Sequence, residues 1–120
     1  MLKVQTYLDR SGVHGTGLFA KQAIKRGTVV WRLDTRCDRL VSEAEYEAMP
    51  EPLQCELFEH HATTYAGLRI LYGDDARFFN HSAKPNVAAR DPISDMVARR
   101  YINIGEEMFV DYSFVSDAAF

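Results

Sequence analysis

The sequence has few cysteines, no long hydrophobic run and no excess of positive charge, and each absence narrows the choice of function. The two cysteines, Cys37 and Cys55, have neither C-x-x-C spacing nor a histidine pair at zinc-finger distance, so we expect no structural metal site. No stretch approaches the roughly 20 apolar residues of a membrane span, and Met1 to Thr6 lack the apolar run of a signal peptide. Fourteen Lys and Arg against seventeen Asp and Glu give a net charge of -3, which argues against a nucleic-acid-binding face. We therefore expect a soluble intracellular protein that binds neither a membrane nor nucleic acid directly.

The composition is typical of a globular chain with one hydrophobic core. The chain has 120 residues, of which 47% are hydrophobic and 26% charged, and it shows no linker or low-complexity segment. Short β-branched or aromatic runs occur just after glycines, at 28–31 and 108–110, and both predict strands. We therefore expect a single domain spanning residues 1–120 that is mainly β.

Segments 20–30 and 98–108 share one pattern. In each, an alanine and a basic residue precede an isoleucine, Ile24 or Ile102, and a glycine three residues later, Gly27 or Gly105. Glycine suits a tight turn because it adopts positive φ without steric cost. The repetition predicts a pseudo-symmetric β fold, with chance similarity as the alternative.

The middle of the chain is different and predicts helices. Ser42 and Glu45 have the spacing of a capping box, and Pro50 is expected to end the helix that they begin. Pro52 is placed to start a second helix with Leu53, Leu57 and Phe58 on its apolar face. We therefore predict a short helical insert at about 42–66 between two β regions.

Three segments contain residue types suited to chemistry. In the first, Gly12, Gly15 and Gly17 lie close together, which lets backbone N–H and C=O groups approach a ligand. This segment is not a Walker A loop, because no Gly-Lys-Ser or Gly-Lys-Thr follows, and it lacks the helix and acidic residue of a dinucleotide-binding fingerprint. A glycine-rich hairpin turn is the alternative.

The second and third segments are 77–86 and 105–114. In the second, Asn80 offers a donor and an acceptor for an amine or carboxylate, and the His81 backbone could bind an adenine edge. The alternative is a loop of Asx turns. In the third, Tyr112 stands among apolar and aromatic residues and could orient an amine, or it could be a packing residue of a core strand.

In this order and at these separations, the three segments resemble the SET-domain family of protein lysine methyltransferases. The match consists of the G-x-G loop, R-F-x-N-H-S-x-x-P-N from Arg77 to Asn86, and G-E-E-x-x-x-D-Y from Gly105 to Tyr112. It covers the chain from about Gly12 to Phe114. The resemblance implies a β-clip-like SET-domain fold of small curved sheets with a C-terminal pseudoknot and a short helical insert.

The resemblance also implies a function. A protein of this family transfers methyl from S-adenosylmethionine to the ε-amine of a lysine in a protein substrate, here a histone tail or other basic protein, without a metal. A catalytically inactive SET-fold binding module is the alternative. The implied catalytic residue is Tyr112. The implied cofactor-binding residues are His14, Gly15, Thr16, Gly17, Asn80 and His81. The implied lysine channel contains Val110, Phe114 and Tyr65, with Phe58 as the alternative to Tyr65.

The chain also departs from the family pattern. It has no cysteine cluster before or after the domain, and the cluster after it normally closes the lysine channel. Phe114, Phe120 or a second subunit of a homodimer would then have to close the channel. Val110 stands two residues before Tyr112, a position that influences how many methyl groups are added. This compact form resembles the short stand-alone SET proteins of viruses and bacteria, so the expected location is the cytoplasm, or a host nucleus for a viral or secreted protein.

Overall fold

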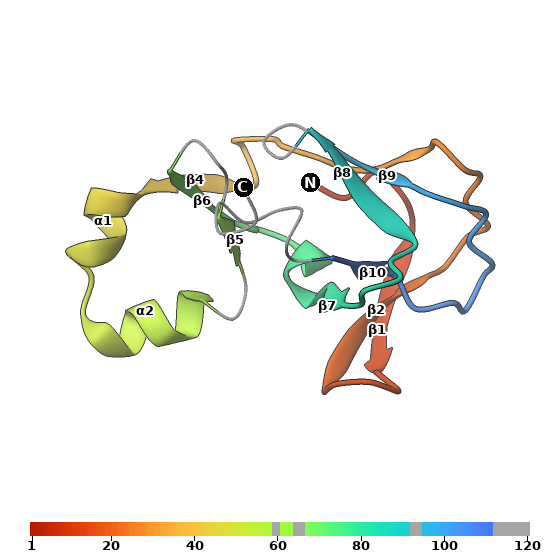
Figure 1. Cartoon of the computed structure of the whole chain (residues 1–120), viewed down its shortest axis with the longest axis horizontal. Coiled ribbons are helices and arrows are strands. Elements are labelled where there is room, and N and C mark those ends of the chain that lie inside the picture. The colour runs from red at the N-terminus through yellow and green to blue at the C-terminus, as the bar shows by residue number, and fades with distance from the viewer. Residues whose placement is uncertain (59–60, 64–66, 92–94, 112–120) are drawn as a thin grey trace.

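The structure is a computed structural model that describes residues 1–58, 61–63, 67–91 and 95–111 (Figure 1). Its strands are β1 (Thr6–Arg10), β2 (Thr16–Ala20), β3 (Val29–Arg32), β4 (Arg39–Ser42), β5 (His61–Thr63), β6 (Leu68–Leu71), β7 (Asn80–His81), β8 (Val87–Asp91), β9 (Asp95–Ala98) and β10 (Phe109–Val110). Its helices are α1 (Glu43–Glu47), α2 (Glu51–Phe58) and the 3-10 helix η1 (Asp75–Phe78). The expectation of a mainly β chain is confirmed.

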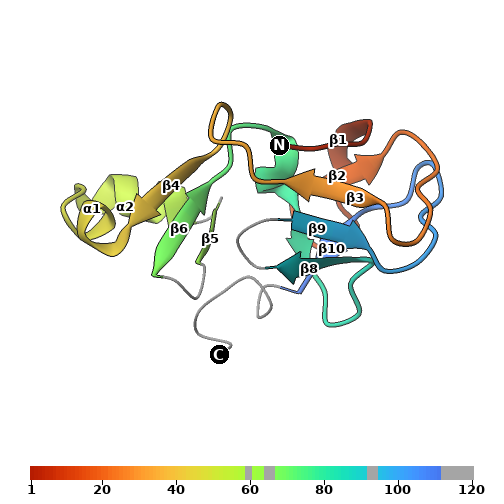
Figure 2. The same cartoon turned by 90° about the horizontal axis from the view of Figure 1, so that it is seen from above.

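In the described part of the chain the strands form four small sheets. β1 and β2 make an antiparallel hairpin, and β7 pairs with β10 in parallel. The other two sheets have three strands each, in the orders β3-β9-β8 and β4-β6-β5, and all of their pairs are antiparallel. Figure 2 shows the β4-β6-β5 sheet between the helices α1 and α2 and the other sheets. No helix in the described ranges has the length and hydrophobicity required to cross a lipid bilayer.

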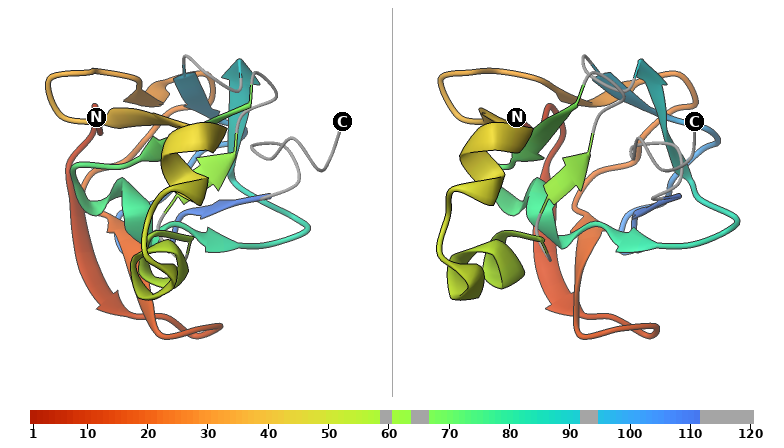
Figure 3. Two further views of the ribbon diagram at one scale, coloured as in Figure 1. Left: turned by 90° about the vertical axis from the view of Figure 1, so that its left-hand side faces the viewer. Right: turned by 60° about the vertical axis from the view of Figure 1, so that its left-hand side comes forward.

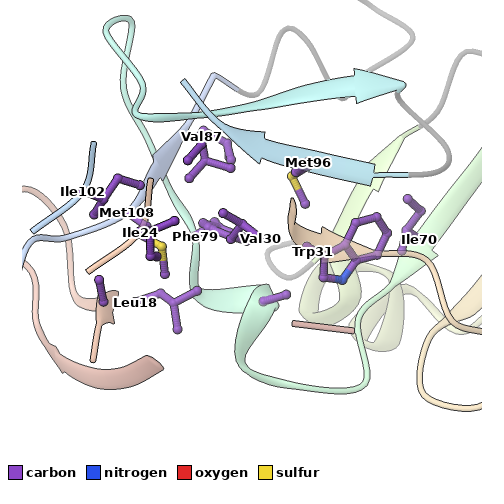
Figure 4. Close-up of a cluster of buried hydrophobic side chains, with 14 residues drawn as sticks. Leu18, Ile24, Val30, Trp31, Ile70, Phe79, Val87, Met96, Ile102 and Met108 are labelled. Atoms are coloured by element: carbon purple, nitrogen blue, oxygen red, sulfur yellow. The ribbon is translucent and has the colours of Figure 1, made fainter. Parts of the chain in front are cut away.

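One hydrophobic core lies between the hairpin, the β3-β9-β8 sheet and β10 (Figure 4). Strand β2 supplies side chains to it on alternate positions, Leu18 and Ala20, because successive side chains of a strand point to opposite faces. In β3 the register irregularity between Val29 and Trp31 places both Val30 and Trp31 in the core. Trp31 is its largest buried side chain and packs edge-on against Tyr72, with ring centroids 5.4 Å apart. Each fully buried large aliphatic side chain contributes about 1.5–3 kcal/mol of transfer free energy.

The two segments with a shared pattern are paired with each other. Ile24 and Ile102 exchange two backbone hydrogen bonds of 2.9 Å each. The Gly27 N–H donates to the Ala98 carbonyl, and the Gly105 N–H donates to the Ala20 carbonyl, both at 2.8 Å. Gly27 and Gly105 have φ values of 85° and 86°, as the predicted tight turns require. The predicted pseudo-symmetry is confirmed.

The helices form a lobe at one end of the molecule, which faces the viewer in the left panel of Figure 3. Ser42 caps α1, and the capping box with Glu45 is present as predicted. Pro52 lies in the first turn of α2, also as predicted. The predicted apolar face is wrong at Leu53, whose exposed fraction is 44%, while the side chains of Leu57 and Phe58 lie outside the described part. The helical part ends at Phe58, and the chain continues into β5, which pairs with β6.

Candidate functional site

The second and third sequence motifs meet in the parallel pair of β7 and β10. Asn80 lies opposite Phe109 and His81 lies opposite Val110. The Ser82 N–H donates to the Val110 carbonyl at 3.0 Å and continues the pairing. The chain therefore leaves β10 beside the Asn-His-Ser motif, directly before the position of Tyr112.

The side chain of Asn80 joins these strands to the glycine loop at 11–17. Its Nδ2 donates to the carbonyl oxygens of His14 at 3.0 Å and Thr16 at 3.1 Å. Asn80 is 8% exposed, whereas residues 12–16 are exposed. Residues that lie 64 and 66 positions apart in the sequence are thus brought into contact, and their role in cofactor binding stays a prediction.

Asn86 holds β10 in place from the other end of the second motif. Its Oδ1 accepts from the Phe109 N–H at 2.8 Å, and its Nδ2 donates to the Glu107 carbonyl at 2.8 Å. Asn86 is 1% exposed, so the Asx-turn alternative does not describe its role. A buried amide with both ends bonded to the backbone of a passing strand stabilises that strand's position.

Glu107 is a site residue that the sequence analysis missed. Its carboxylate accepts from the Ser11 hydroxyl, at 2.8 Å and 2.9 Å to its two oxygens, and from Asn80 Nδ2 at 3.1 Å. Ser11 Oγ in turn accepts from the N–H groups of Val13 at 3.0 Å and His14 at 3.2 Å. The signal was present in the G-E-E motif, but nothing in the spacing links that motif to a serine 96 positions earlier.

Two glycines of the loop are needed for different reasons. Gly15 has a φ of 50°, a left-handed conformation that other residues rarely adopt. Gly17 has an ordinary φ, but a Cβ atom on it would lie 2.4 Å from Glu107 Oε2 and 2.8 Å from Glu107 Cδ. Gly17 is therefore required for the space that the Glu107 carboxylate occupies.

His81 and Asp111 lie at the edge of the site. His81 Nδ1 is 3.7 Å from Asp111 Oδ1, and the His81 side chain is about half exposed. Val110, predicted to line the lysine channel, is 4% exposed and belongs to the hydrophobic core cluster. Its side chain therefore packs in the core, and its predicted place in the lysine channel stays a prediction.

Several predicted residues lie outside the described residues. These are the catalytic Tyr112 and the channel residues Phe114 and Tyr65; of Phe58 only the helical backbone is described. Their predicted roles stay predictions. His14, Gly15, Thr16, Gly17, Asn80 and His81, which were predicted to bind the cofactor, are all brought together around the loop and β7.

The residues present fit the S-adenosylmethionine that the family resemblance implies. The amide oxygen of Asn80 accepts no hydrogen bond from the described ranges, although Asn80 itself is buried, so an acceptor remains for an ammonium group. A Cβ atom built at Gly12 or Gly15 would meet no atom within 4 Å, so there is open space beside the loop. An acceptor on a mostly buried residue next to an open loop suits the polar end of such a ligand.

One group of side chains has the composition of a metal site. The ligand atoms of Cys37, Asp38 and Asp74 lie within 4.8 Å of one another. Asp38 accepts from the ammonium of Met1 at 2.7 Å, and Asp74 accepts from the Leu2 N–H at 2.8 Å. Burial, with the neighbouring carboxylates, raises the pKa of the Cys37 thiol, which disfavours the thiolate that binds metals. These contacts account for the group as part of the fold.

Comparison with known proteins supports the motif assignment. The family model described as SET domain matches residues 15–113. The Drosophila melanogaster protein named Histone-lysine N-methyltransferase trr is 30% identical over 118 residues, and the Homo sapiens protein named Histone-lysine N-methyltransferase 2B is 31% identical over 120 residues. These matches cover 90% and 92% of this chain but only 5% and 4% of the lengths of those proteins.

Solved structures show the same fold. A crystal structure of a Plasmodium falciparum protein assigned as a histone methyltransferase superposes with a TM-score of 0.65 at 18% identity, covering 92% of this chain and 95% of that one. A structure of apo ctPRC2 with substitutions in Ezh2 gives a TM-score of 0.72 at 22% identity, covering 91% of this chain and 15% of that chain. At these identities the likeness is one of fold.

Proposed function

Because the chain belongs to the SET-domain family, we propose that it transfers a methyl group from S-adenosylmethionine to the ε-amine of a lysine in a protein substrate. One observation carries the proposal. Three segments far apart in the sequence meet at one place, where Asn80 bonds to the loop carbonyls at His14 and Thr16 and lies beside the strand that leads to Tyr112. In a structural protein whose motifs matched the family by chance, the three segments would not be expected to lie together.

Methyl transfer requires that the methyl donor and the lysine amine are aligned and that the amine is neutral. S-adenosylmethionine supplies, when bound, a methyl group on a positively charged sulfonium. A free lysine has a pKa of about 10.4, so fewer than about one in a thousand is neutral at pH 7. Apolar surroundings and a nearby positive charge lower that pKa. Tyr112 is proposed to orient the neutral amine, and holding two reactants in line supplies a large part of such a rate.

The helical lobe supports a basic substrate. Helices α1 and α2 contain five glutamates and no lysine or arginine, and all five glutamates are exposed. Glu43 and Glu45 pair with arginines of the neighbouring strands, whereas Glu47, Glu51 and Glu56 form no ion pair within the described segments. Unpaired acidic side chains attract basic peptides and reject acidic ones. We propose that the substrate lysine lies in a basic protein segment, of which a histone tail is the prime candidate.

The first test is transfer of labelled methyl from S-adenosylmethionine to a mixture of core histones, with Tyr112→Phe measured in parallel. We expect label on lysine and a fall in turnover of at least about a hundredfold in Tyr112→Phe, because hydroxyl-dependent positioning of the amine is lost. Tyr101→Phe is the matched control, since Tyr101 is half exposed and the substitution removes the same hydroxyl group.

Each other outcome has a definite meaning. Near-normal turnover in Tyr112→Phe would remove the catalytic role from that residue. Binding of S-adenosylhomocysteine by the parent chain, with no transfer to histones or other basic proteins, would favour the inactive binding module. Absence of both binding and transfer would overturn the proposal.

A further inference from the structure

We propose that Glu107 is a positioning residue for the cofactor, and that its carboxylate sets the conformation of the glycine loop at 11–17. The inference rests on the proposed function for the identity of the ligand, but the loop contacts themselves do not depend on it. Glu107 would act through Ser11 and Asn80, and the methyl and amine groups would not touch it.

The carboxylate holds the loop from both ends. At the start of the loop, Glu107 accepts from the Ser11 hydroxyl, and the same oxygen of Ser11 accepts from the N–H groups of Val13 and His14. At the end of the loop, Glu107 Oε2 accepts from Asn80 Nδ2, which also donates to the carbonyls of His14 and Thr16. Both sets of loop contacts therefore meet at one charged group.

The backbone of Glu107 is fixed by the core. Glu107 forms a bridge with Phe19, the next residue Met108 donates its N–H to the Leu18 carbonyl at 2.8 Å, and Asn86 bonds to the Glu107 carbonyl. Met108 and Leu18 are fully buried. A side chain that starts from so rigid a position can impose its geometry on an exposed loop.

Within the described ranges, the Glu107 carboxylate accepts hydrogen bonds only from neutral groups. In the described parts of the chain no cation lies within ion-pair distance of its carboxylate, and the two contacts that it makes are with a hydroxyl and an amide. Hydrogen bonds to an ionised acceptor are roughly twice as strong as neutral ones. Glutamine in this position would lose the charge and direct an N–H₂ group at either Ser11 or Asn80.

Gly17 provides independent support. Its missing side chain leaves the space in which Glu107 Oε2 sits, 2.4 Å from where a Cβ atom would be. Any other residue at position 17 would displace the carboxylate or the loop. The second glycine of the motif and the glutamate of the third motif are thus complementary in shape.

The test compares Glu107→Gln with Glu106→Gln, two identical changes on adjacent residues. Affinity for S-adenosylhomocysteine is measured by calorimetry, and exchange of the Val13 and His14 amide hydrogens by NMR. For Glu107→Gln we expect affinity to fall by at least about tenfold and both amides to exchange faster. For Glu106→Gln, whose carboxylate bonds chiefly to Asn103 and Arg100 and only at 3.5 Å to Asn86 Nδ2, we expect changes within about twofold. Unchanged affinity and unchanged amide exchange in Glu107→Gln would overturn the proposal.

Kinetics separate positioning from a general loss of fold. In Glu107→Gln the KM for S-adenosylmethionine should rise, while kcat at saturating cofactor stays within about threefold of the parent. A fall in kcat larger than about threefold, with no change in KM, would overturn the positioning role. Should Glu107→Gln not fold, Ser11→Ala removes one end of the same network and is expected to free the Val13 and His14 amides.

A double-substitution cycle tests the shape complementarity. Gly17→Ala alone should weaken binding, but it should add little in a Glu107→Ala background, because the crowded carboxylate is then absent. Fully multiplicative effects would show that Gly17 does not act through Glu107. If the parent chain bound no S-adenosylhomocysteine at all, the proposed function would fail, while the amide-exchange comparison would still decide whether Glu107 holds the loop.

Discussion

The segments 20–30 and 98–108 have the same backbone arrangement and different tasks. Each passes through a buried isoleucine and a left-handed glycine into a strand, and each glycine donates to the alanine that begins the other segment. After Gly27 the chain continues with Thr28 and Val29 into the β3-β9-β8 sheet. After Gly105 it continues with two glutamates, and the second of them reaches the glycine loop. One repeated turn therefore builds the core at one end and delivers a charged group to the site at the other.

The largest expected effect tests whether the two segments contribute equally to the free energy of unfolding. Ile24 and Ile102 are 1% and 0% exposed and bond to each other through their backbones. We expect Ile24→Ala and Ile102→Ala each to lower the free energy of unfolding by about 2–5 kcal/mol, measured by urea denaturation. Strongly unequal losses would show that the symmetry of the backbone does not extend to its packing.

A smaller effect is expected at the two glycines. Both have φ near 85°, and a Cβ atom would meet nothing within 4 Å at Gly27 and only the Tyr7 hydroxyl at 3.8 Å at Gly105. Gly27→Ala and Gly105→Ala should therefore each cost about 1–2 kcal/mol of backbone strain in thermal unfolding. Gly12→Ala is the matched control, because Gly12 has neither a left-handed φ nor a close neighbour. Gly12→Ala serves as a control for stability only, because Gly12 lies in the glycine loop itself. Between Gly27→Ala and Gly105→Ala, affinity for S-adenosylhomocysteine sharpens the comparison, since of these two only Gly105→Ala should lower it.

The smallest effect concerns pH and involves only the second segment. Partial burial by itself would raise the pKa of Glu106, but the Arg100 guanidinium at 2.5 Å and the Asn103 N–H at 3.1 Å stabilise its charge, and the pKa is lowered on balance. A lowered pKa in the folded state contributes stability above the unfolded pKa and loses it as pH falls through the folded value. The corresponding residue of the first segment, Thr28, does not titrate.

We therefore expect the parent chain to lose more stability than Glu106→Gln between about pH 6 and about pH 3, by less than about 1 kcal/mol because Arg100 is exposed and the pair is screened. Urea denaturation at several pH values measures this difference. Parallel curves for the two proteins would show that Glu106 contributes nothing through its charge.

Sequence reasoning succeeded where the signal is local. The capping box at Ser42, the helix start near Pro52 and the glycine turns depend on neighbouring residues, and all are present. It failed at Leu53, because the pattern of apolar residues in a short helix does not say whether a partner exists to cover them. In α1, where no residue is buried, propensity and the capping box have to support the helix.

In the site, too, sequence reasoning found some residues and missed others. Asn80 and the loop could be found, because their residue types and order match a family pattern. Glu107 could not be found by local reasoning, since its partners Ser11 and Asn80 lie 96 and 27 positions away. The reason for Gly17 was also hidden: closely spaced glycines suggested access for a ligand, whereas the structure shows space for a side chain of the protein itself.

The glycine loop lies near the start of the chain and its partner Glu107, just before β10, lies near the end of it. This separation determines when the site can form during synthesis of the chain. Ser11 and the loop leave the ribosome early, but their partner Glu107 follows 96 residues later. Contacts of such long sequence separation are slow to form, because the intervening chain must first be ordered. The glycine loop therefore stays without its charged partner until the core strands have assembled. We expect the loop to reach its final conformation late in folding, so the proposed cofactor affinity would be a sensitive report of complete folding.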